Sequence, residues 1–254
     1  MKRLNTPFPT VVFLLFLLFL SICLISNVDE ALFLKLNHLS QVFPDNIWGF
    51  LMNLSNPIVA PLLIFALFHR NQLFLRAFFL TLILALISNY TLKHGFGFER
   101  PSALLESEMF NMIGPMLTSP SFSSGHTLTL FSLVGLISSW YKNRSISFGV
   151  LLVATIISFA SISVGAHWPS DVLLGALMGC LIGWLATEIN TRLDQNITEG
   201  IALTGYFIAL FAGIFSLITK TSYPSGQWLS TAVSMLAIAY ALKSITELLH
   251  RQKG

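Results

Sequence analysis

The sequence predicts an all-helical bundle that crosses a membrane several times, and two observations support this. Of the 254 residues, 54% are hydrophobic and 10% are charged, whereas a soluble domain has about 25% charged residues. The hydrophobic residues also form runs of about 20, the length that an α-helix needs to cross a bilayer. Because no repeat or linker divides the chain, we expect residues 1–254 to form a single membrane domain.

The N-terminal region predicts one span followed by a helix at the membrane surface. Its basic start and apolar run resemble a signal peptide, but no small-residue cleavage site follows, so we expect residues 9–26 to remain as an uncleaved span. Residues 29–41 are too short and polar to cross, and they predict an amphipathic helix capped by Asp29. The apolar face of this helix is expected to hold Leu32, Leu36 and Leu39.

Seven further spans complete a prediction of eight. They lie at about 47–68, 77–92, 126–141, 146–165, 170–188, 199–219 and 227–247. The span at 47–68 contains Pro57 and Pro61, which are tolerated in a membrane when neighbouring groups satisfy the freed carbonyls. A loop of about 30 residues, 94–125, precedes the fourth span, and loops of this length often serve as lids or binding loops.

The distribution of lysine and arginine predicts the orientation. With the N-terminus in the cytoplasm, ten of the 14 basic residues are cytoplasmic and four are outside. The four outside are Lys35, Lys93, Arg100 and Lys220. The same topology places both termini in the cytoplasm and His126, His167 and Asp171 on the outer side. The positive charge thus fits cytoplasmic loops, and no soluble basic domain is present to bind nucleic acid.

The first of three polar stretches, Lys93–Pro101, has cations flanking a short glycine-rich turn. Lysine supplies a point charge and arginine a planar fork, and both suit phosphate oxygens. We therefore interpret Lys93 and Arg100 as phosphate-binding residues. The alternative is that two interfacial cations only anchor the end of a helix.

The second stretch, Pro120–His126, leads directly into the fourth predicted span. Ser123 or Ser124 caps this helix, and Gly125 allows an anion to approach the free amides at its positive end. His126 follows in the first turn, where it is placed to give a proton to a leaving oxygen. The alternative is an ordinary serine-capped helix with an interfacial histidine.

The third stretch holds His167 and Asp171, with Pro169 placed as the first residue of the sixth span. If Asp171 accepts a hydrogen bond from one nitrogen of the His167 ring, the other nitrogen is free to attack phosphorus. The alternative is a buried histidine–aspartate hydrogen bond that only closes a loop. We expect no metal site, because no cluster of further ligands at suitable spacing accompanies this pair.

In combination, the three stretches resemble the signature of the type 2 phosphatidic acid phosphatase family, over roughly residues 47–188. The matching residues are Lys93, Arg100, Pro101, Ser124, Gly125, His126, His167 and Asp171. The resemblance implies that His167 is a nucleophile that forms a phosphohistidine, that Asp171 positions it, and that His126 protonates the leaving group. It also implies that no metal or other cofactor is required. The residues to which it assigns phosphate binding are Lys93, Arg100, Ser124 and Gly125.

Two positions depart from the family pattern. Ser123 replaces a proline before the second motif, and serine also suits a helix start. Ser161 stands where the third motif usually has an arginine, and losing such a phosphate contact costs about 3 kcal/mol, or about a hundredfold in rate. We predict that another outer cation, Lys220 or Lys35, reaches the pocket instead, and Lys220 is favoured because it ends a span.

These features predict a phosphatase of the inner (plasma) membrane that acts at the outer face on a lipid phosphomonoester or pyrophosphate. The resemblance implies undecaprenyl pyrophosphate, phosphatidylglycerol phosphate or phosphatidic acid as substrate. The alternatives are a phosphotransferase acting on lipid A and a catalytically impaired lipid-phosphate binder, the latter favoured by Ser161. We expect residues 47–188 to hold the phosphatase core, in a six-helix arrangement, and residues 199–247 to add a C-terminal helical pair.

Overall fold

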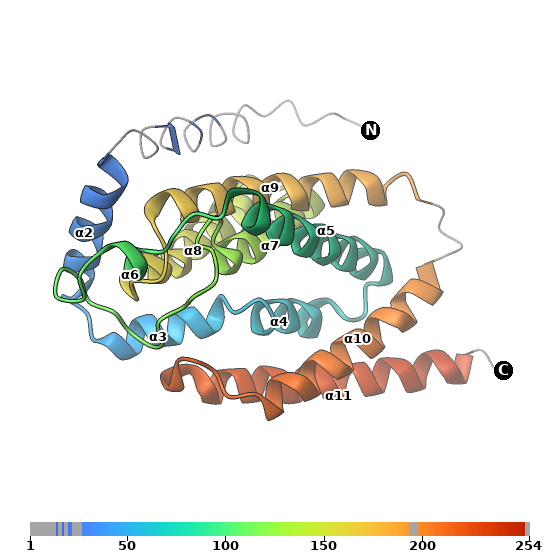
Figure 1. Cartoon of the computed structure of the whole chain (residues 1–254). Coiled ribbons are helices and arrows are strands. Elements are labelled where there is room, and N and C mark those ends of the chain that lie inside the picture. Colours follow the sequence, from blue (N-terminus) through green and yellow to red (C-terminus); the bar gives the residue numbers. More distant parts are fainter. Residues whose placement is uncertain (1–13, 15–16, 18–19, 22–26, 194–197, 252–254) are drawn as a thin grey trace.

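The computed structural model describes residues 14, 17, 20–21, 27–193 and 198–251, and its regular elements there are all helices (Figure 1). The helices are α2 (Val28–Ser40), α3 (Asp45–Leu54), α4 (Val59–Phe68), α5 (Gln72–Phe96), α6 (Pro101–Leu104), α7 (Gly125–Tyr141), α8 (Arg144–Ser163), α9 (Pro169–Asn190), α10 (Thr198–Ile218), the 3₁₀ turn η2 (Pro224–Gly226) and α11 (Gln227–Arg251). The predicted all-helical class is confirmed. The first predicted span, 9–26, lies almost wholly outside the described residues.

Among the described residues, five helices are long and apolar enough to cross a membrane, at the positions of five predicted spans. They are α5, α8, α9, α10 and α11. The fourth predicted span is present as α7, whose 17 residues extend for about 25 Å at 1.5 Å per residue. Large apolar side chains such as Ile83, Leu86 and Phe211 are exposed on these helices, as expected of surfaces that face lipid. The chain is therefore a multi-pass membrane protein.

The predicted span at 47–68 is a bent pair of helices and not one straight helix. The axes of α3 and α4 differ by 56°. Pro57 lies in the break between them, where it has no N–H to continue the helix. The side-chain oxygen of Asn56 accepts hydrogen bonds from the backbone N–H groups of Ile58 (2.8 Å) and Val59 (3.4 Å), and so starts the second helix.

Three glycines allow α9 to pack closely on α7. Gly175, Gly179 and Gly183 recur every four residues and share one face of α9. A Cβ atom added at Gly179 would lie 2.5 Å from the carbonyl oxygen of Leu128. One added at Gly183 would lie 2.1 Å from the carbonyl oxygen of Ser132. Small residues let membrane helices approach in this way, and here they bring the first residues of α9 beside the first residues of α7.

The C-terminal helices α10 and α11 form an antiparallel pair that packs along α4 and α5 (Figure 1). Their common core includes Phe65 and Phe78 on one side and Tyr206 on the other. The Tyr206 hydroxyl donates to the backbone oxygen of His69 at 3.1 Å. The His69 ring in turn stacks on Tyr240, with centroids 4.3 Å apart. Aromatic and polar contacts thus fix the pair to the rest of the bundle.

The expected amphipathic helix at 29–41 is present as α2, but its buried face and its cap differ from the prediction. Leu39 is 61% exposed, whereas Phe33 is fully buried. Asp29 does not cap α2. Its carboxylate instead accepts hydrogen bonds from the backbone N–H (3.0 Å) and the hydroxyl of Ser170, at the start of α9. The difference arises because α2 packs against the end of α8, the start of α9 and the loop after α5.

Asn37 makes the main polar contact between α2 and those segments. Its Nδ2 donates to the carbonyls of Asn111 (2.9 Å), Ile162 (3.1 Å) and Ser163 (3.1 Å). Its Oδ1 accepts the Asn111 N–H at 2.8 Å. The side chain is fully buried, so these bonds satisfy polar groups that water does not reach. α2 therefore ties the long loop after α5 to the end of α8.

Candidate active site

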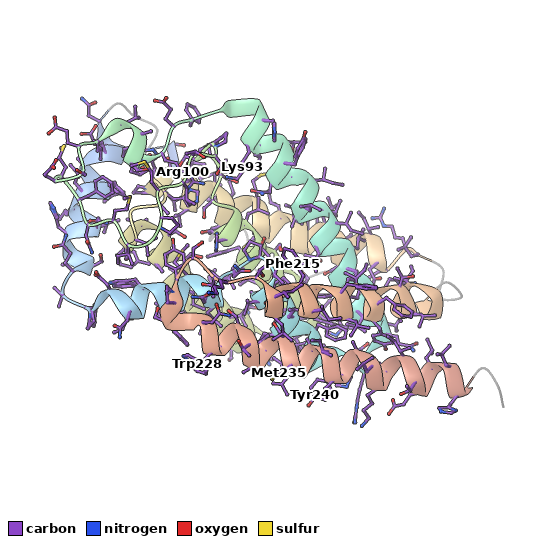
Figure 2. The ribbon with its side chains drawn as sticks, turned by 60° about the horizontal axis from the view of Figure 1, so that its bottom comes forward. Lys93, Arg100, Phe215, Trp228, Met235 and Tyr240 are labelled. Carbon is purple, nitrogen blue, oxygen red and sulfur yellow. The ribbon has the colours of Figure 1, made fainter. Side chains whose placement is uncertain are left out.

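The three polar stretches meet at one end of the bundle. Lys93 lies in the last turn of α5, and Arg100 directly precedes α6. Figure 2 shows these two residues close together at that end, away from Trp228 and Met235 on the outer face of α11. His167 lies in the short connection between α8 and α9. Because α5 and α8 end here while α7 and α9 begin here, their terminal polar groups converge.

His167 is 3% exposed and is held from both sides. Its Nδ1 lies 3.2 Å from Oδ2 of Asp171, and its Nε2 lies 3.2 Å from Nη1 of Arg100. An arginine can only donate, so these partners assign the ring proton to Nδ1 and a lone pair to Nε2. The arrangement leaves Nε2 in the form that acts as a nucleophile.

Asp171 belongs to a network that includes Ser121, a residue that the sequence analysis did not single out. Its Oδ2 accepts hydrogen bonds from the Ser121 hydroxyl (2.5 Å) and the Trp168 backbone N–H (2.9 Å), in addition to His167. The Ser121 hydroxyl also lies 3.4 Å from Nδ1 of His167. Its position one residue after Pro120, inside the second stretch, was the only signal in the sequence that could have identified it.

The guanidinium of Arg100 is fixed by the backbone around the site. Its Nε donates to the carbonyl of Ser119 (2.8 Å), and its Nη1 donates to the carbonyl of Ala166 (2.6 Å). Its Nη2 donates to the hydroxyl of Ser119 (3.1 Å). The side chain of Arg100 is thus held beside His167, where its planar fork of donors suits phosphate oxygens.

Lys93 and Arg100 share one acceptor. Nζ of Lys93 donates to the carbonyl of Pro120 at 2.7 Å, and Nη2 of Arg100 approaches the same oxygen at 3.5 Å. Cations bind an anionic phosphate oxygen more strongly than a neutral carbonyl. A phosphate group is therefore suited to replace the Pro120 carbonyl as the acceptor for both side chains. Within the described part of the chain, no three His, Cys, Asp or Glu side chains group as a metal site would require.

The start of α7 supplies the remaining groups. Ser124 caps the helix by accepting the Thr127 N–H at 3.4 Å, and its own N–H donates to the backbone oxygen of Asp171 at 3.2 Å. The amides of the first turn of a helix have no partner inside it, so they are available to an anion. The His126 ring makes no hydrogen bond to a described residue and lies within electrostatic range of His167.

Burial lowers the pKa of His167 below its ordinary value of 6.5, because a buried site disfavours the charged imidazolium. The hydrogen bond and charge of Asp171 oppose this effect, whereas the positive charges of Arg100 and Lys93 add to it. His167 is therefore neutral at pH 7, which is the form that has a free lone pair on Nε2.

The position of the missing motif arginine is occupied by a buried serine. The Ser161 hydroxyl contacts Sδ of Met52, on α3, at 3.6 Å. Lys35 and Lys220 are both exposed, and neither lines the pocket beside Arg100. Their part in phosphate binding stays a prediction.

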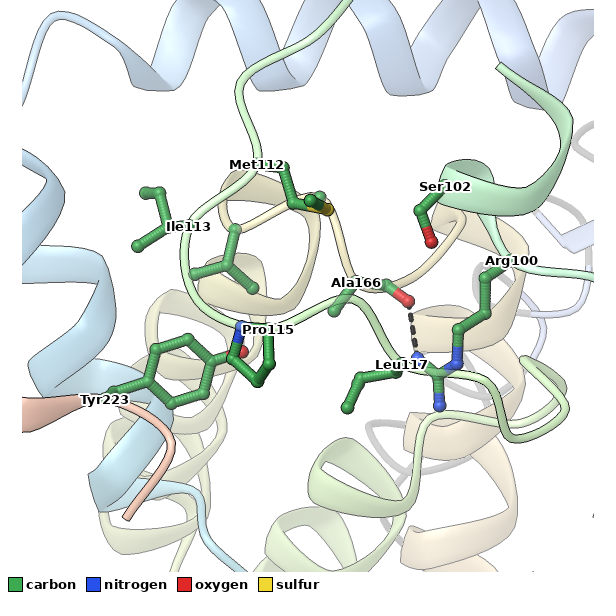
Figure 3. A pocket seen from close by; sticks show the side chains of 10 residues that line it. Arg100, Ser102, Met112, Ile113, Pro115, Leu117, Ala166 and Tyr223 are labelled. Atoms are coloured by element: carbon green, nitrogen blue, oxygen red, sulfur yellow. Dashed lines mark hydrogen bonds between the residues drawn. The ribbon is translucent and has the colours of Figure 1, made fainter. Parts of the chain in front are cut away.

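That pocket connects the site to the C-terminal helices (Figure 3). Arg100 and Ala166 form one side of it, and Tyr223, from the connection between α10 and α11, forms another. The other lining residues are Ser102, Met112, Ile113, Pro115, Leu117, Val164 and Gly165. A residue beyond the predicted phosphatase core thus faces the same space as the site arginine.

The fold and these contacts define a polytopic helical membrane protein with a buried histidine–aspartate pair beside two cations. Residues 74–195 match the family model described as the PAP2 superfamily. The resemblance predicted from the sequence is therefore confirmed over this segment, which contains all three polar stretches.

Individual proteins agree with this assignment. An undecaprenyl-diphosphatase of Sulfolobus acidocaldarius is 32% identical over 139 residues, which are 53% of this chain and 63% of that protein. The chain thus spans less than two thirds of that relative. The crystal structure of Aquifex aeolicus LpxE superimposes with a TM-score of 0.52 at 29% identity, covering 61% of this chain and 94% of that one. A PAP2-type phosphatidylglycerolphosphate phosphatase from Bacillus subtilis has a TM-score of 0.55 at 17% identity, covering 75% and 99%, and supports the fold.

Proposed function

We propose that the protein is a lipid phosphatase that works through a phosphohistidine on His167. The observation that carries this proposal is the pairing of the His167 ring, with Nδ1 toward Asp171 and Nε2 toward Arg100. A histidine that only closed a loop would have no need of a cation held against its second nitrogen. The match of residues 74–195 to the PAP2 superfamily supports the same chemistry.

In the first step, Nε2 of His167 attacks phosphorus and forms an N–P bond while the P–O bond to the lipid breaks. His126 gives a proton to the leaving oxygen. Lys93, Arg100 and the amides at the start of α7 bind the other phosphoryl oxygens, because their positive charge stabilises the charge of the transition state. Asp171 stabilises the cationic ring of the phosphohistidine.

In the second step, water attacks the phosphorus atom and His126, now deprotonated, takes its proton. The N–P bond breaks, its electron pair returns to Nε2 of His167, and inorganic phosphate leaves. Atoms and charge balance without a redox partner. We propose that neither step requires a metal, so activity should persist in the presence of a chelator.

The location of the site favours a substrate that resides in the membrane. It lies at the ends of apolar helices, so a lipid tail can stay in the bilayer while its phosphate reaches His167. We propose undecaprenyl pyrophosphate, phosphatidylglycerol phosphate or phosphatidic acid as substrate. We propose that the protein resides in the inner (plasma) membrane, and the distribution of basic residues supports cytoplasmic termini and an outward-facing site. In this proposal residues 47–188 form the phosphatase core.

The test is phosphate release by the purified full-length protein from a panel of these lipid phosphates. Wild-type protein should release phosphate from at least one of them, and His167→Ala should release none. His94→Ala is a matched control, because His94 is exposed and, among the described residues, its ring hydrogen-bonds only to the Tyr90 carbonyl, at 2.9 Å. Activity that survives His167→Ala would overturn the mechanism. Binding without release from any lipid would favour the catalytically impaired binder.

A further inference from the structure

The connection between α10 and α11 is fixed against the core next to the site. Nδ2 of Asn53, on α3, donates to the carbonyl of Tyr223 at 2.7 Å. The Thr221 hydroxyl accepts the Tyr223 N–H at 2.8 Å. This connection lies outside residues 74–195, the segment that matches the PAP2 superfamily. The backbone of Tyr223 is therefore held in place by hydrogen bonds from residues outside the matched segment 74–195.

The ring of Tyr223 packs against the backbone of Gly114. Gly114 has φ +90°, and a Cβ atom added there would lie 2.8 Å from Cε1 of Tyr223, so the ring packs directly on the glycine backbone. Figure 3 shows the ring pointing from the connection toward Pro115 and the pocket that Arg100 lines. Tyr223 thus occupies a defined position across the pocket from the site cation.

The phenol hydroxyl of Tyr223 is available to donate a hydrogen bond to a ligand. It makes no hydrogen bond to a described residue, and Tyr223 is only partly buried, so a ligand in the pocket can reach the hydroxyl. Burial raises the pKa of Tyr223 to about 12, so the hydroxyl keeps its proton at neutral pH. The positive charge of Arg100 acts on the same group. A hydroxyl donor and a cation that line the same pocket favour an anionic oxygen between them.

We propose that Tyr223 is a specificity-determining residue, whose hydroxyl donates to a second phosphate group on the substrate that is not the one transferred to His167. The inference rests on the proposed phosphatase function and extends it to the C-terminal helices. The ligand group in this proposal is a phosphate oxygen that does not belong to the phosphoryl group transferred to His167. A lipid pyrophosphate and phosphatidylglycerol phosphate both carry one, whereas phosphatidic acid does not.

The decisive variant is Tyr223→Phe, which keeps the ring against Gly114 and removes only the hydroxyl. We expect it to lower kcat/KM about tenfold for a polyprenyl pyrophosphate, for phosphatidylglycerol phosphate, or for both, since a hydrogen bond to a charged group is lost. For phosphatidic acid we expect a change of less than about twofold. Tyr90→Phe is the matched control, because Tyr90 is 62% exposed on α5 and lies away from the pocket.

The arms of the experiment separate the two sources of the second phosphate. A loss confined to the pyrophosphate assigns the contact to an adjacent phosphate, and a loss confined to phosphatidylglycerol phosphate assigns it to a phosphodiester farther along the headgroup. An equal loss for all three substrates, or no loss for any, overturns the proposal.

A binding measurement keeps this test independent of turnover. In a His167→Ala background, inorganic pyrophosphate and orthophosphate are titrated with and without Tyr223→Phe. Weaker binding of pyrophosphate alone, by about tenfold, supports the second phosphate contact even if the wild-type protein proves inactive. Unchanged pyrophosphate binding contradicts it, while the His167→Ala assay on lipids tests the phosphatase proposal separately.

Discussion

Nη1 of Arg100 lies 3.2 Å from Nε2 of His167, so the guanidinium is held against the nitrogen that we expect to attack phosphorus. A phosphoryl group placed between them would form an N–P bond on one side and charge-assisted hydrogen bonds on the other. Because five contacts with surrounding groups already orient the guanidinium, little reorganisation is needed as charge develops.

Arg100→Lys should test whether this fork, and not charge alone, is required. A lysine cannot reproduce the paired donors, so we expect kcat/KM for phosphate release to fall by about 10² to 10³. Arg192→Lys is the control, because Arg192 is exposed and its only ion pair among the described residues is with Glu188 at 3.6 Å. A loss of less than about threefold in Arg100→Lys would show that a point charge is sufficient.

The pH dependence of activity should reflect the lowered pKa of His167. The neutral ring is the active form, and a lowered pKa keeps it neutral to lower pH, so the acid limb of kcat/KM should lie below pH 6.5. Asp171 raises this pKa, so Asp171→Asn should move the limb further down and reduce the rate. Titration of the substrate phosphate is the same for both proteins and cancels in the comparison. An acid limb that moves up in Asp171→Asn would contradict the assignment.

Ser121→Ala should identify Ser121 as a positioning residue for the His167–Asp171 pair. The hydroxyl donates to the Asp171 carboxylate, and its loss should lower kcat about tenfold while KM stays within about twofold. The freed carboxylate should also interact more strongly with His167, so the acid limb should shift to higher pH. Ser158→Ala removes another buried hydroxyl, one with no partner in the described chain. It should change neither kcat nor the position of the acid limb. A purely structural role would leave the pH profile of Ser121→Ala where it was.

Asn37→Leu should lower the stability of the protein by about 3 kcal/mol. The substitution keeps the branched shape but leaves the Asn111 N–H and several buried carbonyls without their partner. Thermal unfolding in detergent would measure the effect, with His38→Leu as the neighbouring exposed control. A melting temperature equal to that of the control would show that α2 is not needed to hold the loop.

The sequence was sufficient for features that depend on local patterns. Apolar runs predicted the helices, and the three polar stretches could be located because each lies where a helix begins or ends. Contacts between distant residues left no such signal. Ser121 and Asp171 are 50 positions apart, and nothing in the local pattern of a serine shows which carboxylate it will meet.

Two other features depend on contacts that the sequence pattern does not show: the bend in the span at 47–68, and the residue of the C-terminal pair that lines the pocket. Prolines in the span at 47–68 were compatible with either a kink or a break, and the cap that Asn56 provides favours the break. Lys220 was predicted to reach the pocket because it is an outer cation at the end of a span, and its role stays a prediction. The structure adds Tyr223, three residues later, as a residue of the same connection that lines the pocket.

Gly183→Ala should separate α9 from α7 and so disturb the site from a distance. The added Cβ would lie 2.1 Å from the backbone oxygen of Ser132, which cannot move aside without shifting a helix. We expect a loss of about 3 kcal/mol in stability and a fall in kcat, because Asp171 and Ser124 are held together by this helix contact. Gly149→Ala is the matched control on α8, where no atom of a described neighbouring residue lies within 4 Å of the added carbon. That variant should gain about 0.5–1 kcal/mol from helix propensity and keep full activity. Equal melting temperatures for the two variants would refute the close packing of α7 and α9.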